Sequence, residues 1–286
     1  MEITKKTLDV EKAFREKNAT LAKMIPGFVY RYLKRVIHQE EMNRFLFDNR
    51  DRHGLEMIAN VLDEFGVNIR VVNEENIPRE GRYVIAANHP LGGLDGMALM
   101  HVIGKYRKDI VFPVNDLLLF IPTLKELFIP VNKHGSNFEN IRLFNETFAS
   151  DKLILYFPAG LVSRKQKGRI KDLVWKKTFI TKAVSYKRDI IPVHMNGRNS
   201  NFFYNLANLR KRLGIKSNIE MLYLPDEMFR QKDRNLVITF GKPIPYTVFK
   251  SKFNHARWAA VLREFVYELG KDPSADFATY IANHKE

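Results

Sequence analysis

The sequence of 286 residues contains no cysteine. This absence excludes disulfide frameworks, thiolate nucleophiles and cysteine-based zinc sites, and it fits a reducing compartment. The sequence also lacks an uninterrupted apolar stretch of the roughly 20 residues that a membrane-spanning helix needs. The nearest candidate, Leu117 to Val131, is broken by Pro122, Lys125 and Glu126, and the opening MEITKK has no apolar core of a secretion signal. We therefore expect a soluble or peripheral protein.

Several enzyme signatures are missing too. The sequence has no Gly-x-Ser-x-Gly elbow, no His-Glu-x-x-His helix, no Gly-x-x-x-x-Gly-Lys phosphate loop and no dinucleotide fingerprint. These absences weaken hydrolase, metalloprotease, nucleotidase and dehydrogenase hypotheses. A metal site built from His89 and Asp95 alone would have too few ligands, so we expect no metal.

Acidic residues are outnumbered by basic ones: the sequence has 32 Asp and Glu against 47 Lys and Arg, which leaves a net charge of +15. This balance indicates an anionic partner, either nucleic acid or an anionic lipid surface. The charge is densest between Leu161 and Arg188, where Asp172 is the single acidic residue. The cations of this run are Arg164, Lys165, Lys167, Arg169, Lys171, Lys176, Lys177, Lys182, Lys187 and Arg188. They form either a solvated basic helix face or a site that receives an anionic substrate.

The content of 45% hydrophobic and 28% charged residues is typical of a folded globular protein. Helical periodicity covers residues 10–25, 28–47 and 55–65, and short apolar runs alternate with helical segments from about residue 80. We predict an α/β fold with a mixed or mostly parallel sheet flanked by helices. The expected strands are Tyr83 to Ala87, Ile110 to Val114, Phe128 to Val131, Leu153 to Phe157, Ile190 to His194, Ile219 to Leu224 and Leu236 to Phe240.

Three regions follow from this pattern: a helical N-terminal region at 1–75, an α/β domain at 76–246 and C-terminal helices at 247–286 that pack on the domain. The C-terminal helices are expected at 253–269 and 274–283. The segment from Phe28 to Ile37 mixes aromatic and aliphatic residues with Arg31, Lys34 and Arg35. It either lies in a membrane interface or packs on the core as an ordinary helix.

The loop at residues 88–96, Asn-His-Pro-Leu-Gly-Gly-Leu-Asp-Gly, follows a predicted strand and precedes a helical segment. His89 and Asp95 form a candidate acid/base dyad, since imidazole takes a proton near neutral pH and a carboxylate fixes its tautomer. The alternative is structural. In that interpretation Asp95 is the N-cap of a helix beginning near Gly96, and the glycines serve a tight turn.

Three further loops follow in order: Leu-Phe-Ile-Pro-Val-Asn-Lys at 127–133, Tyr-Phe-Pro-Ala-Gly-Leu-Val-Ser-Arg at 156–164, and Ile-Ile-Pro-Val-His-Met-Asn-Gly at 190–197. With the first loop, they resemble the glycerolipid acyltransferase family, which includes the 1-acylglycerol-3-phosphate acyltransferases. The resemblance covers about residues 80–245. Family members carry Asn-His, then four intervening residues and Asp, then a Phe-Ile-x-Arg block, Phe-Pro-Glu-Gly, and a Val-Pro or Ile-Pro block.

The sequence departs from this family pattern at three places. Five residues separate His89 from Asp95. This longer, glycine-rich loop resembles that of a bacterial branch linked to ornithine and glycine lipids, in which an O-acyltransferase adds the second chain to a hydroxyl. Ala159 stands where the family has Glu, and Asn132-Lys133 stands where Arg is usual. Both family positions are linked to the glycerol phosphate acceptor, so the resemblance implies a different head group.

By the family's mechanism, His89 is the general base on an acceptor hydroxyl and Asp95 orients the imidazole. The donor is a fatty acyl thioester of acyl carrier protein or coenzyme A, and no bound cofactor is implied. Backbone amides near Gly92, Gly93 or Gly160 are candidates for the oxyanion. Substrate contacts are expected from Asn88, Gly92, Gly93, Asn132, Lys133, Phe157, Pro158, Gly160, Arg164, Lys165 and Lys167. For the last three, the alternatives are the anionic part of the donor, that of the acceptor, and acidic lipid head groups. His194 and His101 are expected to be structural.

The predicted function is O-acylation of a lyso-lipid, of the lyso-ornithine or lyso-glycine type, at the inner face of the cytoplasmic membrane. The alternatives are acylation of 1-acylglycerol 3-phosphate in phospholipid synthesis, a nucleic-acid binder, and a lipid-binding relative without catalysis. Most aromatic residues fall in core-like runs, which disfavours nucleic acid because its binding needs basic and aromatic residues interleaved on one surface.

Overall fold

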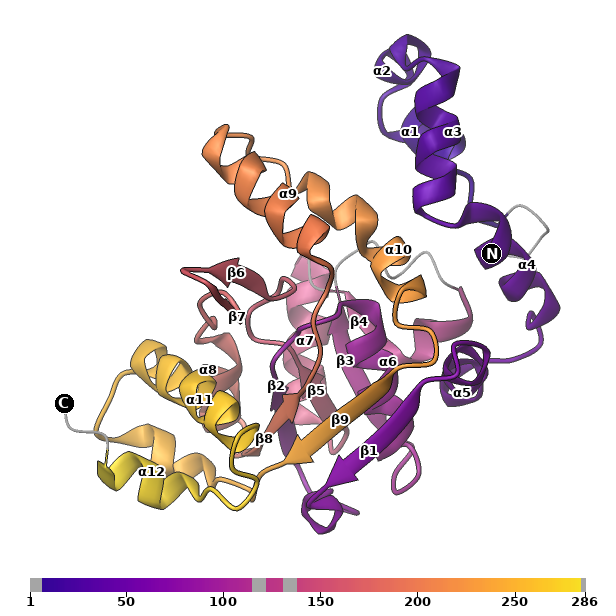
Figure 1. Ribbon diagram of the computed structural model, residues 1–286. Helices are drawn as coiled ribbons and strands as arrows, with labels where there is room; N and C mark the ends of the chain where they lie inside the picture. Colours follow the sequence, from indigo (N-terminus) through magenta and orange to yellow (C-terminus); the bar gives the residue numbers. More distant parts are fainter. Residues whose placement is uncertain (1–6, 115–121, 131–137, 284–286) are drawn as a thin grey trace.

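The computed structural model describes residues 7–114, 122–130 and 138–283 (Figure 1). The helices are α1 (Val10–Lys17), α2 (Ala19–Met24), α3 (Gly27–Val36), α4 (Gln39–Asp48), α5 (Gly54–Glu64), α6 (Gly93–Ile103), α7 (Phe138–Ala149), α8 (Thr178–Ser185), α9 (Asn201–Arg212), α10 (Leu224–Phe229), α11 (His255–Leu269) and α12 (Phe277–Asn283). The strands are β1 (Asn68–Val72), β2 (Tyr83–Ala87), β3 (Ile110–Val114), β4 (Phe128–Pro130), β5 (Leu153–Tyr156), β6 (Arg164–Gln166), β7 (Arg169–Lys171), β8 (Asp189–Met195) and β9 (Asn235–Phe240).

A seven-stranded sheet of order β1-β9-β8-β2-β5-β3-β4 forms the centre of the molecule. Its strands pair in parallel except for β8 and β9, which are antiparallel. The predicted fold class is therefore confirmed. Because β2, β5 and β8 run in parallel, the loops that follow them emerge at one edge, the carboxyl edge, as Figure 1 shows.

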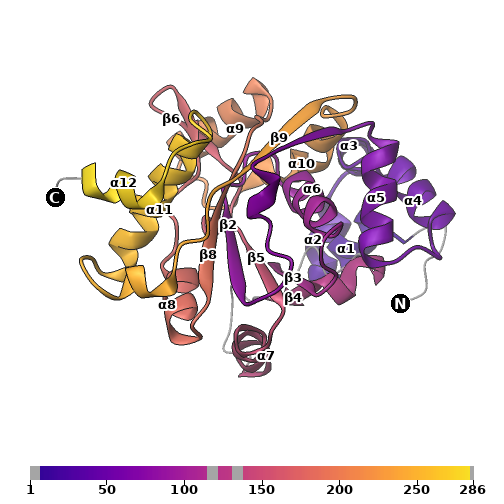
Figure 2. The ribbon, with the colours of Figure 1, turned by 90° about the horizontal axis from the view of Figure 1, so that it is seen from below.

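Alternate residues of β2 point to opposite faces of the sheet, and each face is covered by helices (Figure 2). Ile85 and Ala87 belong to a buried cluster with α5 and α6, whereas Val84 and Ala86 belong to a cluster with α7, α8 and α11. All four side chains are fully buried. Continuous apolar strands are thus explained by burial on both faces.

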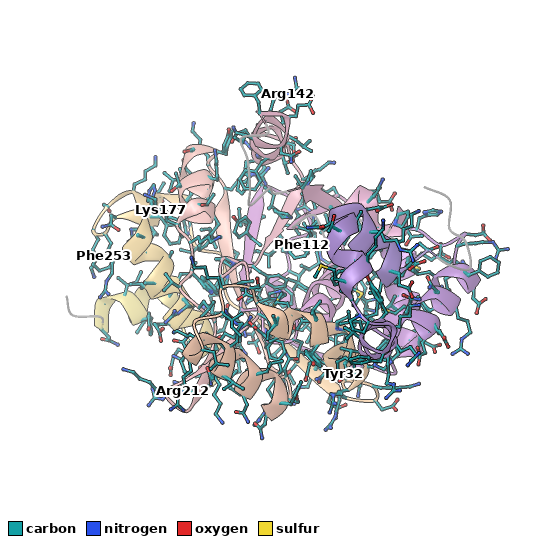
Figure 3. The ribbon with its side chains drawn as sticks, turned by 90° about the horizontal axis from the view of Figure 1, so that it is seen from above. Tyr32, Phe112, Arg142, Lys177, Arg212 and Phe253 are labelled. Atoms are coloured by element: carbon teal, nitrogen blue, oxygen red, sulfur yellow. The ribbon has the colours of Figure 1, made fainter. Side chains whose placement is uncertain are left out.

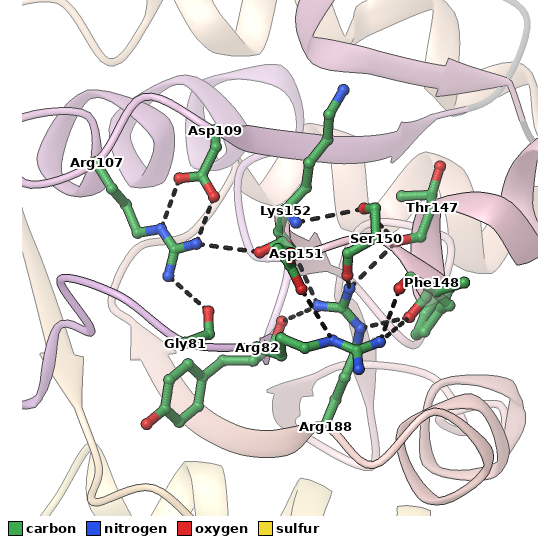
Figure 4. Close-up of polar contacts among 12 residues, drawn as sticks. Gly81, Arg82, Arg107, Asp109, Thr147, Phe148, Ser150, Asp151, Lys152 and Arg188 are labelled. Carbon is green, nitrogen blue, oxygen red and sulfur yellow. Dashed lines mark hydrogen bonds and ion pairs between the residues drawn. The ribbon is translucent and has the colours of Figure 1, made fainter.

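The amino ends of these strands meet at the opposite edge, the amino edge, where Arg188 precedes β8 (Figure 4). The Arg188 side chain is fully buried and donates hydrogen bonds to the carbonyl oxygens of Phe148 at 2.8 Å and Lys152 at 2.8 Å. It also reaches the carbonyls of Thr147 and Ser150. The basic run between Leu161 and Arg188 is therefore not one solvated helix face, because its last member binds backbone inside the protein.

Several predicted boundaries are wrong. Residues 219–224 are not a strand, because Ile219–Tyr223 form a 3₁₀ helix that runs into α10. The predicted helix at 10–25 is divided at Asn18, which is extended, and the helix at 28–47 is divided at His38, which has a left-handed φ of 52°. The last residue of the predicted strand from Phe128 lies outside the described residues.

Two elements were not expected from the sequence. Strand β1 pairs with β9, so the sheet extends beyond the predicted domain range of 76–246. Strands β6 and β7 form an antiparallel hairpin whose turn residues, Lys167 and Gly168, have φ values of 48° and 79°. Two successive positive φ values are typical of a two-residue hairpin turn.

Of the helices in the described ranges, none combines the length and the apolar character that crossing a bilayer requires. The segment that was expected either in a membrane interface or on the core forms α3, which buries Tyr30 and Val36 and exposes Phe28 and Tyr32. Helix α3 therefore has both a packed face and an aromatic outer face.

Candidate active site

His89 and Asp95 come together in the loop between β2 and α6. The His89 Nδ1 atom lies 3.0 Å from Asp95 Oδ2, and Asp95 is completely buried. The same oxygen accepts hydrogen bonds from the backbone N–H groups of Leu91 at 2.7 Å and Gly92 at 3.0 Å. Two backbone donors show that this carboxylate oxygen is an acceptor, and an imidazole nitrogen that faces it at this distance makes a hydrogen bond when it carries the proton. We therefore assign the proton to Nδ1, which leaves the Nε2 lone pair for chemistry.

The backbone at Gly92 makes this contact possible. Gly92 has a φ of 97°, a conformation that side-chain-bearing residues rarely adopt, and α6 begins at the next residue. Asp95 is therefore the third residue of α6 and not the N-cap of a helix beginning near Gly96. Its carboxylate reaches back to the N-cap amide of Gly92, where the helix dipole favours negative charge. The structural and the dyad interpretations are compatible, because one oxygen serves both contacts.

Phe157, the residue directly after β5, holds the imidazole plane. Its ring stacks on His89 with the centroids 4.2 Å apart and 15° between the planes, and Phe112 packs edge-on against Phe157 at 5.2 Å. The His89 side chain keeps 17% of its surface exposed, and its Nε2 has no hydrogen-bond partner within the ranges that the structure describes. The ring is thus fixed in plane and open at one nitrogen.

A second buried carboxylate, Asp172, fixes the backbone of His89. Its Oδ1 accepts from His89 N at 3.1 Å and from the Ser163 hydroxyl at 2.5 Å, and its Oδ2 accepts from the Trp175 indole at 2.8 Å. The Ser163 amide also donates to the His89 carbonyl at 2.7 Å. Burial raises the pKa of Asp172, and these hydrogen bonds oppose that shift. This role was not expected from the sequence, although Asp172 is the lone acid in the basic run.

Asn88 was expected to contact substrate, and the structure places it elsewhere. Its side chain is buried, with Nδ2 donating to the Met195 carbonyl at 2.8 Å and Oδ1 accepting from the Met195 amide at 2.7 Å. These two bonds join the carboxyl ends of β2 and β8. Asn88 therefore ties two strands together beneath the loop, and its polar atoms are not available to a substrate.

Arg164 was expected to bind the anionic part of a substrate, and this does not fit its position either. It is buried, ion-paired to Glu220 at 2.7 Å, and its guanidinium lies over the Phe203 ring. Glu220 also binds Arg210 at 2.9 Å. Lys165 is partly exposed on β6, and Lys167 is exposed at the tip of the β6–β7 hairpin. The charge of Arg164 therefore belongs to a structural ion pair.

The candidate oxyanion donors differ in availability. The Gly92 amide donates to Asp95, and the Gly160 amide donates to the Phe157 carbonyl at 3.0 Å. Gly93 is exposed at the first position of α6, where a helix has no internal acceptor for the amide, and no heavy atom lies within 4 Å of the place of a Cβ atom. The Gly93 N–H is thus the available donor of the three.

An open groove of about 960 Å³ lies beside the loop that follows β5. Pro158 is buried and does not line the groove. Ala159 and Gly160 form part of its wall, and its lining carries several cations. These cations are Lys167, Arg169, Lys171, Lys176 and Arg263. Lys171 pairs with Glu264 at 2.8 Å. Asn132 and Lys133, also expected at the site, lie outside the described residues.

The other two candidate histidines stand apart from the dyad. His194 on β8 packs its ring against Gly270 and edge-on against Tyr267, and burial lowers its pKa to about 4. His101 lies on α6, and its pKa is lowered, chiefly by burial. Within the described ranges, no group of three or more metal-ligating side chains is positioned to hold a metal ion.

Comparison with known proteins agrees with the expected resemblance. A model of the acyltransferase family matches residues 12–272, so the chain belongs to this family and is an acyltransferase. The lyso-glycine lipid O-acyltransferase of Bacteroides thetaiotaomicron is 46% identical over 92% of this chain and 97% of its own length. The enzyme of the same name from Phocaeicola vulgatus is 44% identical over 92% of this chain and 95% of its own.

A solved structure is also similar. The 1-acyl-sn-glycerophosphate acyltransferase of Thermotoga maritima aligns with a TM-score of 0.46 and 16% identity, over 86% of this chain and 97% of that one.

Proposed function

We propose that this acyltransferase transfers a fatty acyl chain from a thioester to the hydroxyl of a lyso-glycine lipid. The single observation that carries the chemistry is the 3.0 Å contact between His89 Nδ1 and Asp95 Oδ2, which leaves Nε2 as an open base. The acceptor class is supported by two relatives, at 46% and 44% identity, that are named lyso-glycine lipid O-acyltransferases. The donor we propose is acyl carrier protein or coenzyme A.

In the proposed reaction, His89 Nε2 takes the proton of the acceptor hydroxyl while the oxygen attacks the thioester carbonyl carbon. The carbon–sulfur bond then breaks, and the departing thiolate receives the proton from the imidazolium. Asp95 stabilises the imidazolium, and the Gly93 amide is the proposed donor to the oxyanion. The enzyme forms no covalent intermediate in this scheme.

The proposed acceptor site is the groove beside Ala159. Its cationic lining suits an acceptor whose head group ends in a carboxylate, as that of an N-acylated glycine does. We place the enzyme at the membrane surface, where a lyso-lipid resides.

The test is incubation of the purified protein with acyl-carrier-protein or coenzyme A thioesters and three acceptors. These are an N-acylated glycine with a 3-hydroxyacyl chain, the matching N-acylated ornithine, and 1-acylglycerol 3-phosphate. We expect the glycine compound to be acylated fastest, and His89→Ala to lose about 10²- to 10⁴-fold in rate. His101→Ala is the matched control, because it removes an imidazole from α6 outside the dyad. Full activity in His89→Ala, or a clear preference for 1-acylglycerol 3-phosphate, would overturn the proposal.

A further inference from the structure

Helix α9 carries an apolar stripe that faces solvent. Phe202, Leu209 and Leu213 expose 49%, 53% and 64% of their surfaces. Leu206 lies between them and is partly exposed. The spacings of four, three and four residues place these side chains on one face of the helix and its end. A monomeric protein rarely exposes such a row without a partner for it.

The opposite face of α9 fixes the helix in this orientation. Phe203 and Tyr204 are fully buried, and the Tyr204 hydroxyl accepts from the Asn199 amide at 3.0 Å. Near the other end, Arg210 binds the buried Glu220 at 2.9 Å. The helix cannot turn its stripe inward without breaking these contacts, so the outward direction is built into the fold.

The stripe continues onto the N-terminal helices. The Phe202 ring packs edge-on against Tyr223 with the centroids 4.9 Å apart, and the Tyr223 hydroxyl lies 2.8 Å from that of Tyr32 on α3. One turn before Tyr32, Phe28 exposes 65% of its surface. Both α9 and α3 project from the carboxyl edge, the edge that carries the His89 loop (Figure 1). Apolar and aromatic side chains thus extend across two projecting helices on the side of the active site.

Positive charge flanks the stripe. Lys211, Arg212 and Lys216 are exposed next to Leu209 and Leu213, and no acidic residue occurs from Asn201 to Ile219. On α3, Arg31 and Arg35 are exposed beside Phe28 and Tyr32. Apolar side chains bordered by lysine and arginine are the composition of a helix that lies in an anionic membrane interface.

We propose that the α9 stripe docks on an anionic lipid bilayer, together with the outer face of α3. The apolar side chains enter the interface, and the flanking cations bind phosphate groups. This inference rests on the proposed function in one respect, namely that the acceptor is a membrane lipid. A second copy of this chain is a poorer occupant, because the stretch from Asn201 to Ile219 has no acidic residue that could pair with Lys211, Arg212 and Lys216 of another copy.

The test is flotation of the full-length protein, without substrates, on vesicles of phosphatidylcholine with or without phosphatidylglycerol. We expect wild-type protein to bind the anionic vesicles, and Leu209→Ser/Leu213→Ser to lose about tenfold or more in partitioning. Lys211→Gln/Arg212→Gln should weaken binding to the anionic vesicles alone, by about fivefold or more.

A matched control lies on α7, where Phe138 and Ile141 expose 78% and 54% of their surfaces. Figure 3 shows Arg142 of α7 and Arg212 of α9 on opposite sides of the molecule. Phe138→Ser/Ile141→Ser should therefore bind vesicles as the wild type does. Three results would overturn the inference: wild-type protein that stays off anionic vesicles, equal binding by Leu209→Ser/Leu213→Ser, or equal loss in the α7 control.

Two further measurements separate this inference from the proposed function. Acylation of a short-chain, monomeric acceptor should be unchanged in Leu209→Ser/Leu213→Ser, because α9 lies outside the catalytic dyad. Absence of transferase activity in all proteins, with normal flotation of the wild type, would reject the proposed function alone. Sedimentation equilibrium gives the mass in solution, and a dimer that Leu209→Ser/Leu213→Ser dissociates would reject the bilayer as the occupant.

Discussion

The two edges of the central sheet hold buried charges of opposite sign. At the amino edge, Arg188 and Arg107 gather backbone carbonyl oxygens, as Figure 4 shows. At the carboxyl edge, Asp95 and Asp172 gather backbone N–H groups. The carbonyl groups of Thr147 and Phe148 in the last turn of α7 accept from Arg188, whereas the amides of Leu91 and of the N-cap residue Gly92, just before α6, donate to Asp95. Each charge thus matches the backbone groups that the adjoining helix leaves without partners.

The two edges differ in whether a polar side-chain atom stays open for chemistry once these hydrogen bonds have formed. At the amino edge Arg107 donates to Asp109 and to the Gly81 carbonyl, and Arg188 is enclosed by carbonyl oxygens. At the carboxyl edge, the two carboxylates hold His89 by its ring and by its backbone, and one imidazole nitrogen stays open. A buried charge that binds backbone groups therefore stabilises the fold at one edge and positions a base at the other.

The largest effect that separates the two edges is expected from Asp95→Asn. A neutral amide does not stabilise the imidazolium and can favour the wrong tautomer of His89, so kcat of acyl transfer should fall about 10³- to 10⁴-fold. Asp109→Asn is the matched change at the amino edge and should leave kcat within about twofold. An Asp95→Asn variant that kept a tenth of wild-type activity would show that the Asp95 carboxylate serves only as a helix cap.

The second effect is expected at the amino edge. Arg188→Met leaves several buried carbonyl oxygens without a donor, so the free energy of unfolding in urea should fall by about 3–4 kcal/mol. The exposed Lys177 is a matched control, and Lys177→Met should change that free energy by about 0.5 kcal/mol or less. In folded Arg188→Met protein kcat should be unchanged, and a loss of kcat without destabilisation would show that Arg188 acts in catalysis and not in stability.

The third effect concerns the backbone of His89. Asp172→Asn keeps one acceptor oxygen but loses another, so His89 N or the Trp175 indole loses its partner. We expect kcat to fall about tenfold to hundredfold with little change in KM, because a displaced base is costly even when substrate binds. Ser163→Ala removes one donor and leaves the other two, so its effect should be smaller. An effect of Asp172→Asn on the unfolding midpoint alone would assign this carboxylate to stability.

The smallest effect is a pH dependence of stability at His194. Burial lowers its pKa from 6.5 to about 4, so the unfolded chain takes up a proton in a pH range where the folded protein does not. Stability is therefore lost as the pH falls from about 6.5 to about 4, and the loss from this group between pH 7 and 5 should be about 2 kcal/mol. In urea titrations His194→Asn should have a flatter pH profile. An identical profile in both proteins would place the acid sensitivity elsewhere.

The strands with continuous apolar runs were predictable, because burial on both faces leaves a strong local signal. The predicted bounds of β2 and β3 agree with the structure. Strand β1 was missed because its residues are only partly buried and include Arg70. Residues 219–224 have a strand-like composition, but the fold buries Glu220 there against Arg164 and Arg210.

The sequence by itself determined the acyltransferase family and the loop that holds His89 and Asp95. These two residues are six positions apart with two glycines between them, so the local backbone geometry of one loop can bring their side chains into contact. The tertiary structure decided which charges remain available. Arg164 meets Glu220 56 positions away, and Arg188 binds the Phe148 carbonyl 40 positions away. Such partners cannot be predicted from the neighbouring residues, because a buried cation binds the acceptor groups that the fold brings next to it.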